Sequence, residues 1–141
     1  MRNREEEGIA LLNIERNPLI TIVFALISAV IIYYLIGLFK ELNPLGFLVI
    51  MPAAVLSFQT LWFILNPFAI VYENKITIKQ SILHHKDHYF IDLKKITEKD
   101  GKLYLTYNDG EVGKMKLFGI KNSHIVLLKN EADKFISLPA L

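Results

Sequence analysis

The sequence predicts an α+β membrane protein, in which a two-helix transmembrane hairpin precedes a small antiparallel β domain that ends in a helix. Three observations lead to this fold class. The chain has 141 residues, 52% of them hydrophobic, and its mean hydropathy of +0.34 is high for an ordinary soluble domain. The apolar excess is concentrated in two uncharged runs. After the second run, the hydrophobic period changes from helical to alternating.

Both uncharged runs are long enough to cross a bilayer. Residues 19–39 and 45–65 are each 21 residues long. At 1.5 Å per residue, a helix of this length spans about 31 Å, close to the thickness of the hydrocarbon core. Only residues 40–44 separate the two runs. The helices are therefore expected to be antiparallel neighbours, in a hairpin that covers residues 18–66.

The positive charges favour one orientation of this hairpin. Three arginines precede the first run and twelve lysines follow the second, whereas the connecting turn carries Lys40 alone. By the positive-inside rule, both termini are then cytoplasmic, and we expect a two-pass protein of the inner (plasma) membrane. The absence of cysteine agrees with a reducing compartment.

The two runs are predicted to be structural. Neither contains a charged residue or a histidine, the residue types that mark ion paths and proton relays in membranes, so transport by this chain alone is not expected. Small residues recur at helical spacing and would let two helices approach closely. These residues either pack the two helices of the hairpin against each other or form the contact of the hairpin with a second copy of the chain or a larger membrane subunit. The candidate packing residues, with one buried amide, are Ala25, Ala29, Gly37, Ala53, Ser57 and Gln59.

Beyond residue 66, alternating apolar positions predict a series of short strands. The expected strands cover residues 75–79 and 89–93, a short segment around Ile96, and the two arms of a hairpin at 102–107 and 114–117. Asn108-Asp109-Gly110 lies between these two arms and is a strong hairpin-turn signal.

The C-terminal part of the β domain, which covers residues 67–141, returns to a helical period. Residues 123–136 carry an apolar stripe, with a capping residue before it and lysines toward its end, so we predict a helix. A strand at residues 124–128 is the competing interpretation.

The N-terminal segment, residues 1–17, is expected to contribute to the β domain. Only 74 residues follow Pro67, a size at which one core seldom supplies more than about 3–5 kcal/mol, so support from elsewhere is expected. Residues 9–15 have the apolar content of an extra strand, and an antiparallel hairpin would bring them near the first strand after the membrane. An interfacial helix is the alternative.

Several of these features occur together in one known group of proteins. Strands begin almost at the membrane, from Asn66 to Tyr72, and residues 76–96, the hairpin at 102–105 and a closing helix follow. This order resembles small bacterial membrane proteins that carry a pleckstrin-homology-like (PH-like) domain. The resemblance implies a strongly bent, barrel-like antiparallel sheet of about seven strands, with the helix plugging one open end. It also implies a binding or assembly module rather than an enzyme.

One property of pleckstrin-homology domains is not carried over. Their phosphoinositide site uses a basic cluster that contains arginine, and this chain has no arginine after Arg16. Lysine can bind a membrane surface as a diffuse charge, but it lacks the planar guanidinium with which arginine forms bidentate hydrogen bonds to phosphate.

His84, His85 and His88 form the one sequence cluster that could carry chemistry. In a strand, His84 and His88 would share a face, and in a helical turn one of the first two would approach the third, so either geometry could supply two metal ligands. Two ligands do not make a site, and the fourth histidine, His124, lies far along the chain. No metal or cofactor is therefore predicted. Metal binding, pH sensing and an exposed loop or hairpin end stay open as interpretations.

The sequence predicts no enzyme. It contains no glycine-rich phosphate loop, nucleophile elbow or HExxH pair, and without an aromatic nucleic-acid motif its lysines do not predict a nucleic-acid partner. Two functions stay open. One is a membrane-anchored binding or assembly module whose sheet edge or helix-capped face recruits a protein. The other is an accessory or immunity-type subunit that binds a toxin or a larger membrane complex. The expected partners are the lipid bilayer and either a protein or a second copy of the chain.

Overall fold

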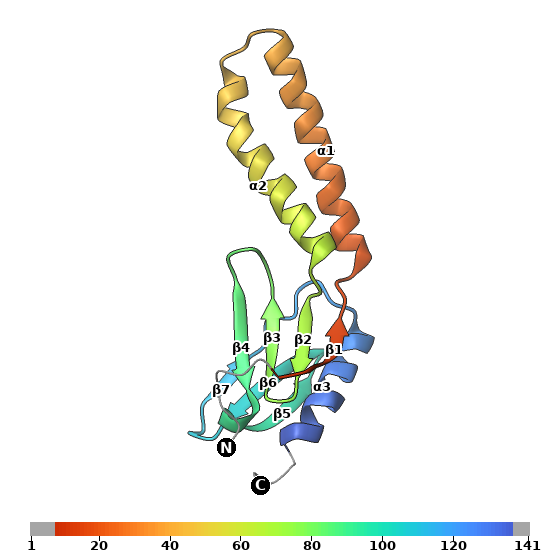
Figure 1. Ribbon diagram of the computed structural model, residues 1–141, viewed down its shortest axis with the longest axis vertical. Coiled ribbons are helices and arrows are strands. Elements are labelled where there is room, and N and C mark those ends of the chain that lie inside the picture. Colours follow the sequence, from red (N-terminus) through yellow and green to blue (C-terminus); the bar gives the residue numbers. More distant parts are fainter. Residues whose placement is uncertain (1–7, 137–141) are drawn as a thin grey trace. The chain divides into compact units, whose positions relative to one another are not determined.

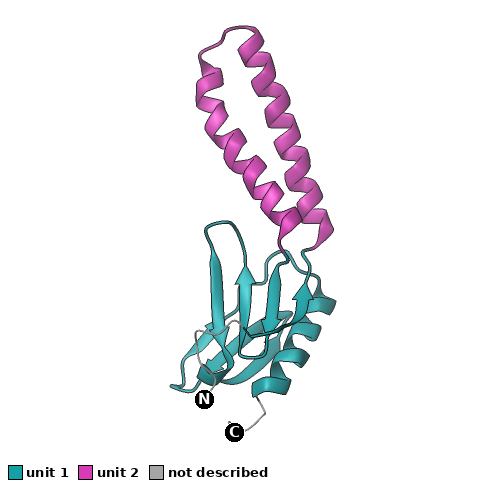
Figure 2. Ribbon diagram, viewed as in Figure 1, with its two compact units in different colours: residues 1–16, 67–141 teal, residues 17–66 magenta. Residues whose placement is uncertain are grey.

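The computed structural model describes residues 8–136 and divides the chain into two compact units (Figure 1). One unit is the helical hairpin, Asn17–Asn66. The other combines Met1–Arg16 with Pro67–Leu141, so the hairpin is an insertion within the sequence of the α+β unit (Figure 2). Arg2 and Arg4, which entered the orientation argument, lie outside the described residues.

The hairpin unit consists of helices α1 (Pro18–Lys40) and α2 (Leu45–Leu65). The side chain of Asn17 accepts a hydrogen bond from the Leu19 amide at 3.1 Å and so caps α1. Both helices are long and apolar enough to cross a membrane, with mean hydropathies of 2.7 and 2.0, and both are largely exposed. These properties are consistent with a two-pass membrane protein.

The first sheet of the α+β unit has four antiparallel strands in the order β1-β2-β3-β4 (Figure 1). Their bounds are β1, Ala10–Ile14; β2, Ala69–Tyr72; β3, Lys75–Lys79; and β4, His85–Tyr89. The N-terminal segment is thus a strand rather than an interfacial helix, and it pairs with the first strand after the hairpin, with Ile14 opposite Ala69. A register shift between Ala10 and Leu12 marks a bulge at Leu11.

The second sheet has three antiparallel strands, and both of its turns follow from the sequence. The strands are β5 (Leu93–Lys99), β6 (Lys102–Tyr107) and β7 (Val112–Lys114). Asp100 and Gly101 join β5 to β6 with φ angles of 54° and 67°, which are typical of a tight two-residue hairpin turn. Between β6 and β7, the Gly110 amide donates to the Tyr107 carbonyl at 3.0 Å.

Three expectations about the sheets are wrong. The second hairpin arm was expected at 114–117, but β7 covers Val112–Lys114. The strands do not form one barrel-like sheet: in the described part of the chain they form two separate sheets and no closed barrel. The strand predicted at 89–93 is interrupted by η1, a turn of 3-10 helix at Phe90–Asp92. This turn is favoured because other groups satisfy its backbone: Phe90 donates to Asn74 at 2.9 Å, and the Asn108 side chain donates to the Ile91 carbonyl at 2.7 Å. The sheet therefore breaks between β4 and β5.

Helix α3 (Asn122–Ile136) closes the core of the α+β unit. It packs mainly against β5, and the ring of Phe135 stacks on that of Phe90 with centroids 5.6 Å apart. The segment at 124–128 is accordingly helical and not a strand. The core draws on both sheets and on the N-terminal strand, and its largest fully buried side chains are Phe68, Ile14, Ile76, Ile96, Leu103, Leu105, Leu128 and Val71.

Candidate functional site

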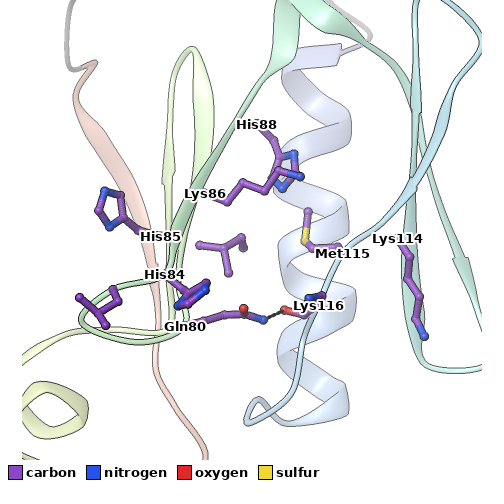
Figure 3. A pocket seen from close by; sticks show the side chains of 10 residues that line it. Gln80, His84, His85, Lys86, His88, Lys114, Met115 and Lys116 are labelled. Atoms are coloured by element: carbon purple, nitrogen blue, oxygen red, sulfur yellow. Dashed lines mark hydrogen bonds between the residues drawn. The ribbon is translucent and has the colours of Figure 1, made fainter. Parts of the chain in front are cut away.

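A cavity of about 280 Å³ opens beside β4, the edge strand of the first sheet, and reaches the end of β7 in the second (Figure 3). Among the residues that the structure describes, three lysines and three histidines line it, and no aspartate or glutamate does. We call it the cationic cleft. Its lining residues are Ile78, Gln80, Leu83, His84, His85, Lys86, His88, Lys114, Met115 and Lys116.

Hydrogen bonds between the two sheets and a buried apolar layer hold this lining in place. The Gln80 side chain donates to the Lys116 carbonyl at 3.0 Å, which joins the end of β3 to the segment after β7 (Figure 3). Ile78 and Met115 are buried beneath the polar groups. β4 pairs with β3 along its whole length, with Lys86 opposite Ile78. On its other side no strand of the described chain pairs with it, and we call this side the open edge.

His88 is the buried histidine of the cluster and lies at the inner end of the cleft. Its Nδ1 is 2.9 Å from the Tyr107 hydroxyl, which joins β4 to β6. Burial, together with the charge of Lys86, lowers the pKa of His88 to about 4, although the charge of Asp87 acts in the opposite direction. Burial and three nearby carboxylates raise the pKa of Tyr107. At neutral pH, His88 and Tyr107 are therefore uncharged hydrogen-bonding groups, and the positive charge of the cleft comes from its lysines.

The other lining groups point in different directions (Figure 3). The Lys86 side chain extends toward His88, whereas Lys114 runs away from it, and the His85 ring is turned from the other two imidazoles. Among the described residues, no group of three or more histidine, cysteine, aspartate or glutamate side chains could hold a metal ion.

The exposed loop at the mouth of the cleft brings Ser81 and His84 together. The Ser81 hydroxyl lies 3.4 Å from His84 Nδ1, but it also accepts a hydrogen bond from the His84 amide at 3.1 Å. This pair closes the turn between β3 and β4. No carboxylate among the lining residues orients the imidazole, as nucleophilic catalysis by serine would need.

The acidic residue nearest to the cleft is engaged elsewhere. Asp87 binds the Lys75 ammonium at 2.6 Å and the Thr77 hydroxyl at 2.7 Å, on the neighbouring strand β3. Burial raises the pKa of Asp87, but these hydrogen bonds together outweigh burial and hold the pKa below its ordinary value. Lys75 also lies over the rings of Tyr72 and Tyr89. Asp87 therefore neutralises Lys75 and not the lysines of the cleft.

The candidate packing residues of the hairpin divide between two faces. Ala53 is buried and Ser57 is partly buried in α2, where the Ser57 hydroxyl donates to the Ala53 carbonyl at 2.7 Å. Ala25, Ala29 and Gly37 are exposed, so contact with another molecule stays a prediction for them. Gln59 is partly buried, and its amide nitrogen has no hydrogen-bond partner in the described structure.

The polar link between the two helices uses residues that sequence reasoning missed. The hydroxyls of Ser28 and Thr60 are 3.0 Å apart and buried. Beside them, the rings of Phe24 and Phe63 meet edge to face at 5.0 Å. The spacing of Phe24, Ser28, Ile31 and Leu35 could have indicated this face, because it follows the seven-residue repeat of antiparallel helices.

Comparison of the chain with models of protein families, with curated proteins and with solved structures finds no match. The chemistry of the site therefore rests on its geometry. A cleft with mobile ammonium groups at its rim, neutral hydrogen-bonding groups inside and an open strand edge can hold an anionic group and an extended backbone. Two imidazole–hydroxyl pairs occur at the cleft among residues 8–136: Ser81 with His84 in the exposed turn, and the buried His88 with Tyr107.

Proposed function

We propose that the protein is a membrane-anchored, non-enzymatic binding module, and that its cationic cleft receives an acidic segment of a protein partner. The observation that carries this proposal is the lining of the cleft. Lys86, Lys114 and Lys116 contribute positive charge, and within residues 8–136 no lining carboxylate offsets it. Acidic side chains of a partner would supply the missing negative charge and raise the association rate.

The open edge of β4 favours a protein segment over a small molecule. A strand edge presents unpaired amide and carbonyl groups, and an extended segment that pairs with it gains backbone hydrogen bonds, while alternate side chains enter neighbouring pockets. Every second side chain of a segment on β4 would face the cavity beside His88. Backbone pairing would thus supply affinity, and the lysines would select acidic sequences.

The hairpin supplies the anchor in this proposal, with the α+β unit on the cytoplasmic side of the inner membrane. Orientation rests on the lysine-rich sequence after the second helix. The proposed role agrees with what the sequence resemblance to PH-like domains implies, since binding and assembly are their general roles.

A photo-cross-linking residue in place of His85, on the open edge of β4, tests the proposal in intact cells. We expect a cross-link to a protein that contains an acidic segment, and loss of this cross-link in the Lys86→Glu, Lys114→Glu double variant. The matched control is Lys94→Glu, Lys95→Glu, which makes the same charge change at exposed positions of β5. Equal cross-linking in both double variants would show that the cleft does not select an acidic partner.

A further inference from the structure

Two loops at one end of the α+β unit carry large apolar side chains that face solvent. Leu83, between β3 and β4, is 85% exposed, and Phe118, between β7 and α3, is 81% exposed. We call residues 80–84 and 115–121 the tip loops. The hydrogen bond from the Gln80 side chain to the Lys116 carbonyl joins them.

The tip loops lie at the end of the sheet from which both connections to the hairpin leave. The Lys79 amide donates to the Phe68 carbonyl at 2.8 Å, so the start of the β3–β4 loop is beside the start of β2. The Arg16 guanidinium donates to the Lys79 carbonyl, which places the end of the N-terminal segment at the same point. The Arg16 guanidinium also lies over the Phe68 ring, 5.3 Å from its centroid.

Both connections are short. Three residues separate Ile14 from Pro18, and three separate Leu65 from Ala69. An extended chain advances at most about 3.6 Å per residue, so each connection reaches no more than about 14 Å. The tip loops lie at the end of the sheet where these connections begin. If the two helices cross a bilayer, the length of the connections therefore limits the distance between this end of the sheet and the bilayer surface.

The tip loops and the residues that flank them in the sequence carry charge of one sign. Residues 79–86 and 112–121 contain five lysines and no aspartate or glutamate. Exposed apolar side chains surrounded by lysine are typical of surfaces that bind the interface of anionic membranes, since the apolar groups enter the headgroup region and the ammonium groups meet lipid phosphates.

We propose that the tip loops bind the surface of a bilayer containing anionic lipid, with Leu83 and Phe118 inserted at the interface and the surrounding lysines on the lipid phosphates. This contact goes beyond the proposed protein-binding function. It shares with that function the membrane anchor and five residues of the cleft lining, Gln80, Leu83, His84, Met115 and Lys116. It fixes the orientation of the α+β unit, because a third attachment is added to the two connections. The open edge of β4, which continues from the tip loop, is then presented close to the membrane surface.

Single cysteines in the full-length chain test this contact, because the sequence contains no cysteine. Leu83→Cys, Ile91→Cys and Val30→Cys are each labelled with a fluorophore that reports polarity, and each protein is placed as a single copy in a lipid nanodisc. Ile91 is the matched control: it is 58% exposed and lies in η1, at the opposite end of β4. Val30, in the middle of α1, reports on the anchor.

We expect the label at position 83 to shift to the blue and lose quenching by aqueous acrylamide in discs that contain phosphatidylglycerol. The shift is smaller in phosphatidylcholine alone and decreases with salt. The label at position 91 stays quenched. In the Leu83→Cys background, Lys116→Gln, Lys121→Gln weakens the shift, whereas Lys94→Gln, Lys95→Gln on β5 leaves it unchanged.

The outcomes separate this inference from the proposed function. If the label at position 30 is in lipid but the label at position 83 is quenched as strongly as that at position 91, the lipid contact of the tip loops is wrong. The proposed anchored module is not affected by this result. A water-exposed label at position 30 overturns the anchor and both proposals with it. Single-copy discs contain no other copy of the chain and no membrane extract. If the label at position 83 is protected from acrylamide only after a second copy or a membrane extract is added, the tip loops contact a protein and not lipid.

Discussion

Burial makes the stability of the α+β unit depend on pH through His88. Its pKa is lowered from 6.5 to about 4 in the folded chain, so between these values the unfolded chain binds the additional proton. The contribution of His88 to the free energy of unfolding is therefore complete above pH 6.5 and decreases as the pH is lowered toward 4. The total loss is on the order of 2–3 kcal/mol. We expect thermal melting of the full chain in mild detergent to show this decrease.

Two variants separate His88 from other titrating groups. His88→Gln keeps an amide that can bond to Tyr107 but does not titrate, so the decrease in Tm between pH 6.5 and 4 should become much smaller. His84→Gln alters an exposed histidine of the same cluster and should keep the wild-type pH profile. Asp87 has its pKa lowered below the ordinary carboxyl value, so its contribution is lost only at more acidic pH. Equal profiles for wild type and His88→Gln would contradict the assignment.

Gln59 gives a second test at a single position. Its buried amide nitrogen lacks a hydrogen-bond partner in the described structure, and an unsatisfied buried donor costs about 1–3 kcal/mol. Gln59→Leu should therefore leave the hairpin equally stable or more stable, and should leave its mass in detergent, measured by light scattering, unchanged. The matched variant Ser28→Ala removes a satisfied hydroxyl and should lower the Tm. A lower mass for Gln59→Leu would show instead that the amide bonds to a second copy.

Among the elements, the three helices and most strands were predictable from their apolar periods, whereas strand β4, the bounds of β7 and the turn η1 were not. Helix α1 extends one residue beyond each end of the predicted run, from Pro18 to Lys40. The turn at Phe90–Asp92 was missed because its backbone is satisfied by Asn74 and Asn108, which no local pattern reveals. The closed barrel failed for the same reason, since this turn separates the two sheets.

The candidate site was only partly visible in the sequence. His84, His85 and His88 stand out as a cluster, and the structure places all three at the cationic cleft. Lys114 and Lys116 come from the other sheet, and their approach depends on how the two sheets pack, which periodicity does not specify. Tyr107, the partner of His88, is likewise nineteen positions away along the chain.

Strand β1 is the element whose contribution is most easily measured. Ile14 is 1% exposed and belongs to the common core, whereas Leu11, on the same strand, is 43% exposed at the bulge. Ile14→Ala should cost about 2–4 kcal/mol, because it leaves a cavity in a packed core. Leu11→Ala should cost much less. Amide hydrogen exchange of β2 in the full chain measures both effects, and equal protection in the two variants would show that β1 is not part of the cooperative core.

The insertion of the hairpin between two paired strands constrains the topology of the whole molecule. β1 and β2 are hydrogen-bonded neighbours, and one precedes α1 while the other follows α2. Both ends of the hairpin must therefore lie on the same side of any membrane that the helices cross. This argument is independent of charge, and the lysines after the hairpin then favour the cytoplasm as that side.

Cysteine labelling in intact cells tests this topology. A cysteine at Asn43, in the turn between the helices, should react with a membrane-impermeant maleimide added from outside, whereas a cysteine at Asn130, exposed on α3, should react only after the cells are permeabilised. The full chain has no cysteine of its own, so each signal comes from one position. The reverse pattern would place the α+β unit outside. Equal reactivity of both positions in intact cells would mean that the hairpin does not cross, because paired strands β1 and β2 permit only an even number of crossings between them.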